Sequence, residues 1–334
     1  MSLEDVPGQQ QAARQLRCAF ENGRLAHAYL FVGPEGVGRT ALARKLAGVL
    51  LCEQTPEEAD RCGRCRGCRM FNDEAHPDYH EAGVPEGKQK FPVALIRDLQ
   101  DTAAVKPTRS DPKVFLLRDT DRMSLEAANC FLKTLEEPPG DAVFLLIAPS
   151  TRLLPTTIVS RCQVVRLTNL AADAVADELE GDELSAEDAA WLARRCWGSP
   201  GLARRLAEAG LAQFNTDLVD SLSNLDVSRN FALSDWLQEE ADERADSRSE
   251  HRLVLQQLLE SVAIYYRDLA VLAATGDAAR LFNSELAELD AGDSDVDKLV
   301  ERAEAALMAI DHVDSNVNEQ LALDYLFTRL AAGQ

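Results

Sequence analysis

The chain has 334 residues, of which 46% are hydrophobic and 27% charged, and its formal net charge is −21. These values are ordinary for a globular protein, and the length allows two or three domains with a large core. The strong negative charge argues against nucleic-acid binding by this chain alone, because such binding depends on contacts from Lys and Arg to phosphates.

The negative charge is concentrated toward the end of the chain. From Gln213 onward there are 25 of the 56 acidic residues but only 9 of the 35 Lys and Arg residues. We interpret this excess as solvated helix faces that favour solubility. The first residues contain no basic and apolar leader, and no apolar run is long enough to span a bilayer. We therefore expect a cytoplasmic protein whose cysteines stay reduced.

Strand-like and helix-like segments alternate along the first half of the chain. The expected strands are short apolar runs at residues 28–32, 114–117, 143–148 and 164–167. The expected helices cover residues 40–51 and 125–137, and Pro138-Pro139 stops the second of them. This alternation predicts an α/β fold, in which helices cover both faces of a parallel sheet.

The segment from Gly33 to Thr40 follows the first expected strand and opens the first expected helix. Its pattern, Gly-x4-Gly-Arg-Thr, is typical of a phosphate-binding loop, in which Gly33, Gly36 and Gly38 let backbone N–H groups surround a phosphate. The usual Lys before Thr40 is replaced by Arg39, and a planar guanidinium is a poor substitute for a compact ammonium. The motif therefore predicts a nucleotide-binding fold with a degenerate loop.

Four of the eight cysteines lie close together, at Cys52, Cys62, Cys65 and Cys68. Four thiolates at this spacing are typical of a closed, tetrahedral Zn²⁺ site with a structural role. Disulfide bonds are the alternative, which the expected reducing environment disfavours. The other cysteines have no partner in sequence and are expected in the core: Cys18, Cys130, Cys162 and Cys196.

A nucleotide-hydrolysing site also needs carboxylates at the end of a core strand, one to hold Mg²⁺ and one to position the attacking water. The strand at 114–117 is followed instead by Arg118-Asp119-Thr120-Asp121. A cation at the first position opposes Mg²⁺ binding. Asp119 could stand in for the second carboxylate, but we favour the interpretation of Asp119 and Asp121 as solvated loop acids.

No strand is expected after residue 170. Residues 171–212 are expected to form a small helical unit, which contains the turn Gly198-Ser199-Pro200-Gly201. Helices continue from residue 213 to the end, and residues 316–327 have the periodicity of an amphipathic helix.

Taken together, these motifs resemble the clamp-loader subunits of bacterial DNA polymerase III. The matching runs are Leu25–Phe31, the loop at 33–40, Cys52 with Cys62–Cys68, His76–Tyr79, Ala128-Asn129 with Leu132–Pro139, Ser160–Cys162 and Gly198–Gly201. The resemblance implies an AAA+ domain at residues 1–168 with an inserted zinc module at 52–68, a helical lid at 169–212 and a helical collar at 213–334 for oligomerisation.

The resemblance also implies partners. A protein of this family is a subunit of a hetero-pentamer with gamma/tau and delta subunits, which loads the sliding clamp onto primer-template DNA during replication. In the family, the arginine of a Ser-Arg-Cys run reaches the ATP of the neighbouring motor subunit, which gives Arg161 the role of an arginine finger acting in trans. From the residues alone, an ion pair at a strand edge is the simpler interpretation of Arg161.

Within the family, the chain looks like the delta-prime branch and not like the motor subunits. Arg39 and Arg118 depart from the ATP site of the motor subunits, and Gly201 stands where these carry a sensing arginine, with Arg204 and Arg205 close by. These departures imply a largely non-hydrolysing subunit of the polymerase holoenzyme, with no polymerase activity of its own. They leave ATP binding open.

Two alternatives have different consequences. The chain could be an ATP-hydrolysing gamma/tau-type subunit that tolerates Arg39. It could also be a zinc-dependent nucleic-acid binder, because four arginines surround the cysteines: Arg61, Arg64, Arg66 and Arg69. The net charge of −21 and the lack of aromatic residues among these arginines argue against the second alternative.

Overall fold

The computed structural model describes residues 3–54, 60–85, 88, 90–109, 112–179, 184–225, 230–245, 247–288, 295–315 and 317–331. The chain divides into two compact units. The first consists of residues 1–178 with 196–202, and the second of residues 179–195 with 203–334. The domain boundaries predicted at residues 168 and 212 stay predictions.

The first unit is built on a five-stranded parallel sheet, in the order β2-β3-β4-β1-β5. The strands are β1 Ala28–Val32, β2 Tyr79–Ala82, β3 Val114–Leu117, β4 Val143–Ala148 and β5 Gln163–Arg166. Every residue of β1, β3 and β4 is buried, as expected for strands whose two faces are both covered. The predicted α/β fold is therefore confirmed.

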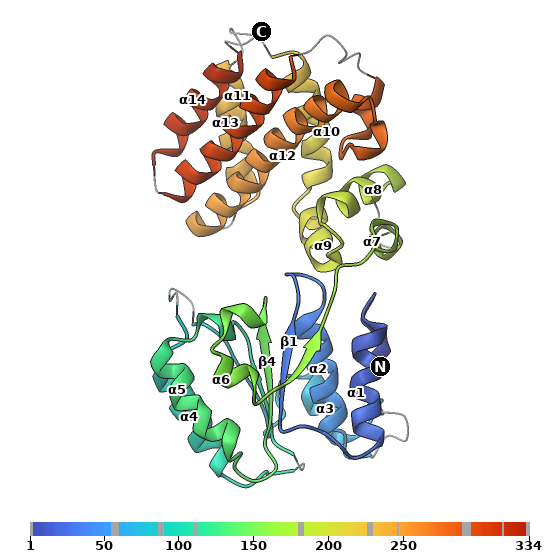
Figure 1. Ribbon diagram of the computed structural model, residues 1–334, viewed down its shortest axis with the longest axis vertical. Helices are drawn as coiled ribbons and strands as arrows, with labels where there is room; N and C mark the ends of the chain where they lie inside the picture. The colour runs from blue at the N-terminus through green and yellow to red at the C-terminus, as the bar shows by residue number, and fades with distance from the viewer. Residues whose placement is uncertain are drawn as a thin grey trace. The chain divides into compact units, whose positions relative to one another are not determined.

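Helices pack on both faces of this sheet (Figure 1). One face carries α1 Gln10–Glu21, α2 Arg39–Leu50 and the short α3 Arg66–Asn72, and the other carries α4 Val93–Ala104, α5 Leu125–Glu136 and α6 Thr156–Val159. Successive strand side chains point to opposite faces. Tyr29 and Phe31 of β1 accordingly join the apolar cluster under α1 and α2, whereas Leu30 joins the cluster under α4 and α5.

The sequence did not predict α1, α3, α4 or β2. Strand β2 lies at the edge of the sheet and contains Tyr79, His80 and Glu81, so it has no continuous apolar run to mark it. The prediction of a core position was wrong for one cysteine. Cys18 on α1 is exposed, while Cys196 is buried and the other two cysteines outside the cluster are half-buried.

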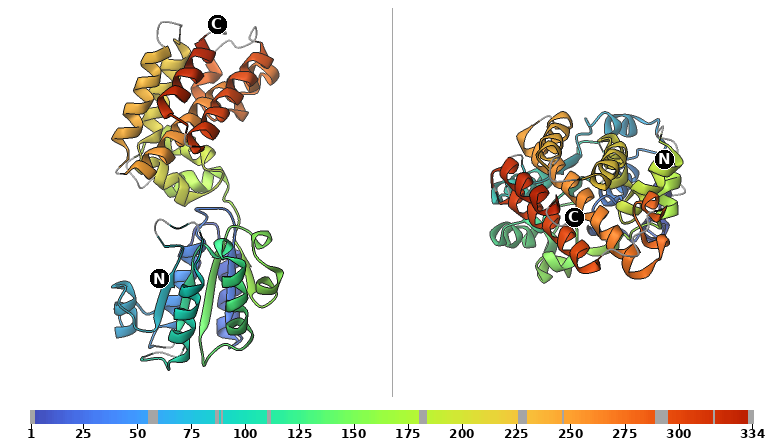
Figure 2. Two further views of the ribbon diagram at one scale, coloured as in Figure 1. Left: turned by 90° about the vertical axis from the view of Figure 1, so that its left-hand side faces the viewer. Right: turned by 90° about the horizontal axis from the view of Figure 1, so that it is seen from above.

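In its described part, the second unit is helical. Its helices are α8 Ala186–Arg195, α10 Leu211–Ser223, α11 Asn230–Glu243, α12 Arg248–Thr275, α13 Val296–Asp314 and α14 Glu319–Ala331. Helices α11 to α14 lie side by side (Figures 1 and 2). Helix α14 is the predicted helix at 316–327, although Asn316 lies outside the described residues. Two more helices lie near the unit boundaries. Almost all of α7 Ala172–Leu179 belongs to the first unit, and α9 Pro200–Glu208 begins in the first unit and continues in the second.

None of the described helices combines the length and the apolar character needed to cross a membrane.

Candidate functional site

The phosphate-binding loop stands in the predicted setting, between β1 and α2. Gly38 precedes the first residue of α2 with a φ of 96°, and Gly36 has a φ of 73°. Both values lie in the left-handed region, which glycine adopts with little strain. The glycines at these two positions thus follow from the backbone path, and the N–H groups of the first turn of α2 lie where a phosphate would bind.

The loop is covered by the segment that begins α9. The backbone N–H of Gly201 donates to the carbonyl of Gly36 at 3.0 Å. A Cβ atom added to Gly36 would lie 2.1 Å from Oγ of Ser199, and one added to Gly201 would lie 2.8 Å from the Gly36 carbonyl oxygen. A side chain at position 201 therefore does not fit in this arrangement, which excludes a sensing arginine at that position.

Arg39 is half-buried beside the loop. Burial lowers the pKa of its guanidinium, and the nearby charges of Glu35, Asp121 and Asp119 oppose this shift. Its Nη1 atom is buried and has no hydrogen-bond partner among the described residues. Asp119, which could stand in for the water-positioning carboxylate, and Asp121 thus lie near an arginine of the loop, and its positive charge offsets part of their negative field.

Arg118 pairs with a residue of the edge strand β2. Its Nε lies 3.2 Å from Oε1 of Glu81 on β2. Arg44 on α2 donates to both oxygens of the same carboxylate, at 2.9 and 2.8 Å. Burial alone would raise the pKa of Glu81, but the bonds from Arg44 and Tyr79 outweigh it and lower that pKa. The residue at the predicted metal position therefore belongs to an ion-pair network.

The four clustered cysteines converge on one point. All four sulfur atoms lie within 4.8 Å of one another, with Cys52 Sγ 4.0 Å from Cys65 Sγ and Cys62 Sγ 3.9 Å from Cys68 Sγ. A tetrahedral Zn²⁺ with Zn–S bonds of about 2.3 Å needs sulfur–sulfur distances of about 3.8 Å. The cluster is thus positioned to bind a metal ion, and its geometry fits zinc.

Backbone groups of the cluster stabilise thiolates. The N–H of Cys65 donates to Cys62 Sγ and the N–H of Cys68 donates to Cys65 Sγ, each at 3.3 Å. Bonds from the N–H groups of Arg64 and Cys65 lower the pKa of Cys62 to about 6. Burial raises the pKa of Cys68, a cost that a bound cation offsets.

Arg161 lies between α6 and β5 and is held within its own chain. Its Nη1 donates to the carbonyl of Thr157 at 2.9 Å, and its Nη2 pairs with the carboxylate of Glu136, the last residue of α5. About a third of the Arg161 side chain is exposed. The ion pair expected from the residues alone is therefore present, and it fixes the guanidinium at the surface.

The sheet places Arg161 and the phosphate loop at opposite ends of its strands. Strands β1 and β5 are parallel, with Tyr29 opposite Gln163 and Val32 opposite Arg166. Arg161 precedes β5, whereas Gly33 follows β1, so the whole length of the strands, roughly 15 Å, lies between them. Arg161 therefore cannot serve the phosphate loop of its own chain.

Comparisons with known proteins agree with these features. A family model described as "DNA polymerase III, delta subunit" matches residues 8–171. The chain is 38% identical over 209 residues to the DNA polymerase III subunit delta' of Pseudomonas aeruginosa, covering 60% of this chain and 61% of that protein. It is 35% identical over 254 residues to the DNA polymerase III subunit tau of Escherichia coli, covering 73% of this chain and 39% of that protein.

A solved structure of a DNA polymerase III gamma subunit-related protein from Thermotoga maritima covers 95% of this chain and 99% of its own, with a TM-score of 0.44 and 17% identity. The chain spans about three fifths of the length of the P. aeruginosa relative and less of the tau relative. The activity and partners of the complete proteins are therefore not carried over by the match itself.

Proposed function

Because the chain belongs to the delta-prime family of bacterial DNA polymerase III subunits, we propose that it works in a clamp loader, as a largely non-hydrolysing AAA+ subunit. In this role it joins gamma/tau and delta subunits in a hetero-pentamer in the cytoplasm. The pentamer places the sliding clamp on primer-template DNA during replication.

One observation carries the proposal most directly: Arg161 and the phosphate loop of the same chain lie at opposite ends of the parallel strands β1 and β5. An exposed arginine that cannot reach its own loop can stabilise charge only on a nucleotide bound by a neighbour. A trans arginine of this kind raises the rate about 10³–10⁵-fold in other nucleotide triphosphatases. Glu136 and the Thr157 carbonyl support the role, because they hold the guanidinium in one orientation before assembly.

The state of the chain's own loop supports the non-hydrolysing part of the proposal. Arg39 replaces the lysine that contacts phosphates, and Arg118 replaces the metal-binding acid and is paired with Glu81. Gly201 packs against Gly36, where an arginine has no room. Hydrolysis needs all three functions at once, so we expect no turnover of ATP by this chain alone.

The cysteine cluster has a separate role in the proposal. With four protein ligands a Zn²⁺ ion has no open position, so the metal stabilises the segment around α3 and does no chemistry. The collar role of residues 213–334 is supported by apolar side chains that remain exposed on two neighbouring helices. These are Val300, Leu307 and Met308 on α13, and Leu321 and Tyr325 on α14.

A gamma/tau-type motor subunit is the second candidate, because tau proteins are also among the relatives. It predicts sustained Mg²⁺-dependent ATP hydrolysis by the isolated chain. The three departures at the loop argue against it.

The test is reconstitution of the clamp loader from this chain and its cognate gamma and delta subunits. Arg161→Ala should assemble with the same stoichiometry and bind the same amount of zinc, but it should lower the ATPase activity stimulated by clamp and primed DNA. The loss should be partial, because motor subunits supply their own trans arginines at the other interfaces. Arg166→Ala, which removes an exposed arginine at the other end of β5, is the matched control.

Two outcomes would contradict the proposal in different ways. If the chain fails to assemble with gamma and delta, the clamp-loader role is wrong. If it assembles but Arg161→Ala behaves like Arg166→Ala, the finger is wrong and Arg161 has only a structural role.

A further inference from the structure

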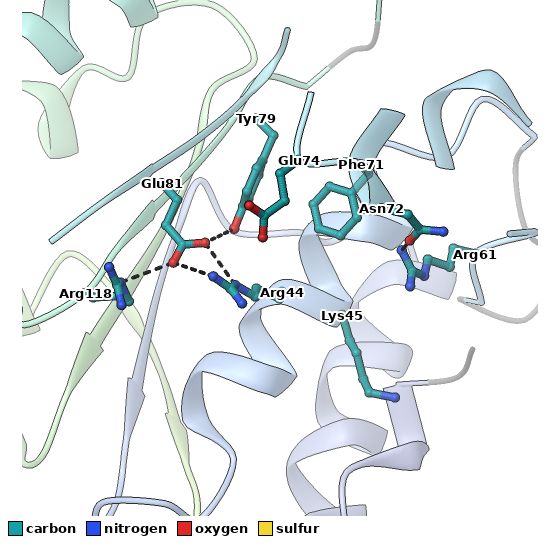
Figure 3. Close-up of a pocket in the computed structure, with 9 residues that line it drawn as sticks. All are labelled: Arg44, Lys45, Arg61, Phe71, Asn72, Glu74, Tyr79, Glu81 and Arg118. Carbon is teal, nitrogen blue, oxygen red and sulfur yellow. Dashed lines mark hydrogen bonds and ion pairs between the residues drawn. The ribbon is translucent and has the colours of Figure 1, made fainter. Parts of the chain in front are cut away.

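The first unit has a cavity of about 630 Å³ between α2, α3 and the edge strand β2 (Figure 3). We call it the α2–β2 groove. Its cationic lining residues are Arg44, Lys45, Arg61 and Arg118, against two carboxylates, Glu74 and Glu81. Lys45 also pairs with Asp5 at 3.2 Å. With this acid counted, the four cations of the groove still outnumber its carboxylates, in a chain whose net charge is −21. This contrast with the rest of the surface favours an anionic ligand.

The ion pairs in the groove leave positive charge facing solvent. Arg44 and Arg118 share the single carboxylate of Glu81, so together the three side chains keep one positive charge. The side chain of Glu81 is only 16% exposed, whereas those of Arg44 and Arg118 are 48% and 51% exposed. The acid therefore lies beneath and orients the two guanidiniums, whose outer edges remain available to a second carboxylate.

The two aromatic residues of the groove contact each other and neighbouring polar side chains. Phe71 and Tyr79 meet edge to face with ring centroids 4.9 Å apart, and the guanidinium of Arg61 lies over the Phe71 ring at 5.5 Å. The Tyr79 hydroxyl donates to Glu81 at 2.7 Å. Binding of a single nucleic-acid strand typically uses an open aromatic face on which a base can stack. These rings instead offer an apolar wall for aliphatic side chains.

Glu74 adds a negative charge at the rim. It follows Asp73, the C-cap of α3, with a φ of 54°, in a position where glycine is usual. The N–H of Ala75 bonds back to the Met70 carbonyl at 2.8 Å. Figure 3 shows the Glu74 side chain beside Tyr79. A carboxylate at this place repels a polyanion with a charge on every unit, but it tolerates a peptide in which acidic residues are spaced by others.

From these features we propose that the α2–β2 groove binds an acidic peptide segment of a partner protein. Carboxylates of the peptide bridge the outer edges of Arg44 and Arg118, a further acid lies near Lys45, and aliphatic side chains pack against Phe71 and Tyr79. This site is separate from the arginine finger. It adjoins the cysteine cluster, because the segment that the cluster holds contributes Arg61, Phe71 and Asn72 to the lining.

The test uses the full chain and a fluorescein-labelled peptide of alternating Glu and Ala, with binding followed by fluorescence anisotropy. The double variant Arg44→Gln/Arg118→Gln should bind about three- to thirtyfold more weakly than wild type, the range for losing two exposed ion pairs. Arg97→Gln, which removes an exposed arginine from α4, should bind like wild type. Added salt should weaken binding.

Two further measurements make the result independent of any folding defect in the double variant. Lys45→Gln should also weaken binding, and Glu74→Gln should tighten it, because a repulsive charge is removed from the rim. The proposal is overturned if Arg97→Gln loses as much affinity as the double variant, or if Glu74→Gln leaves binding unchanged. It is equally overturned if a labelled oligothymidine binds the groove more tightly than the peptide, which would identify a nucleic-acid site.

Discussion

Two loops flank helix α2, and they differ in whether the side chains needed for their chemistry are present. In the cysteine cluster after the helix, four sulfur atoms converge and backbone N–H groups point at them. In the phosphate loop before the helix, the glycines and the strand–loop–helix path are present, but Arg39 faces protein acids. After β3, Arg118 is paired with Glu81. A backbone can thus be retained for its architecture after the groups needed for chemistry have been replaced.

The largest effect should come from removing a ligand of the cysteine cluster. Cys65→Ser removes one of four metal ligands, and because metal binding and local folding are coupled, zinc should fall from about one equivalent per chain to less than about a tenth. Elemental analysis of protein purified without added metal measures this. Hydrogen exchange should become fast in residues 60–72 while β1 and β4 stay protected.

Cys130→Ser is the matched control for this variant, since Cys130 is a half-buried cysteine outside the cluster. It should keep its zinc and its slow exchange. If Cys65→Ser retains a full equivalent of zinc, the four-cysteine site is wrong.

An added side-chain atom in the phosphate loop should destabilise the protein, even though we expect the loop not to hydrolyse ATP. Gly36→Ala puts a Cβ atom 2.1 Å from Ser199 Oγ and should lower the free energy of unfolding by about 1–3 kcal/mol more than Gly23→Ala. Gly23 has a similar φ, 60° against 73°, but nothing lies within 4 Å of an added Cβ. The difference between the two variants in urea denaturation therefore isolates the packing of the segment at 199–202. Equal losses would mean that this segment does not close the loop.

The contrast between the loops also explains what the sequence could predict. Apolar runs marked β1, β3 and β4, and cysteine spacing marked the metal cluster, because both signals are local. The network at Glu81 was missed, since it joins Arg44, Glu81 and Arg118 only after the sheet has put β2 beside β3. The same holds for Gly36 and Gly201, whose contact depends on the tertiary fold.

A smaller effect should follow from freeing Arg161. In the reconstituted clamp loader, Glu136→Gln removes the ion pair that orients the guanidinium, so the stimulated ATPase activity should fall severalfold, by less than in Arg161→Ala. The Glu136→Gln/Arg161→Ala double variant should be no worse than Arg161→Ala alone, because the two residues act as one unit. Glu126→Gln, at an exposed position near the start of α5, should leave the rate unchanged.

Additive losses in the double variant would separate Glu136 from the finger. In that case Glu136 acts elsewhere at the interface, and the position of Arg161 is set by α6 and the Thr157 carbonyl alone.

The smallest effect is expected at the nucleotide site itself. The isolated chain should hydrolyse ATP no faster than its Thr40→Ala variant, and Arg39→Lys should not raise the rate, as measured by phosphate release with Mg²⁺. Restoring the lysine supplies one contact to phosphate, but it leaves Arg118 at the metal position and Gly201 against the loop. Since transition-state stabilisation needs the metal and the phosphate contacts together, one restored group should give no measurable turnover. A rate in wild type clearly above that of Thr40→Ala would show that the loop has kept its chemistry, and the contrast between the two flanks of α2 would disappear.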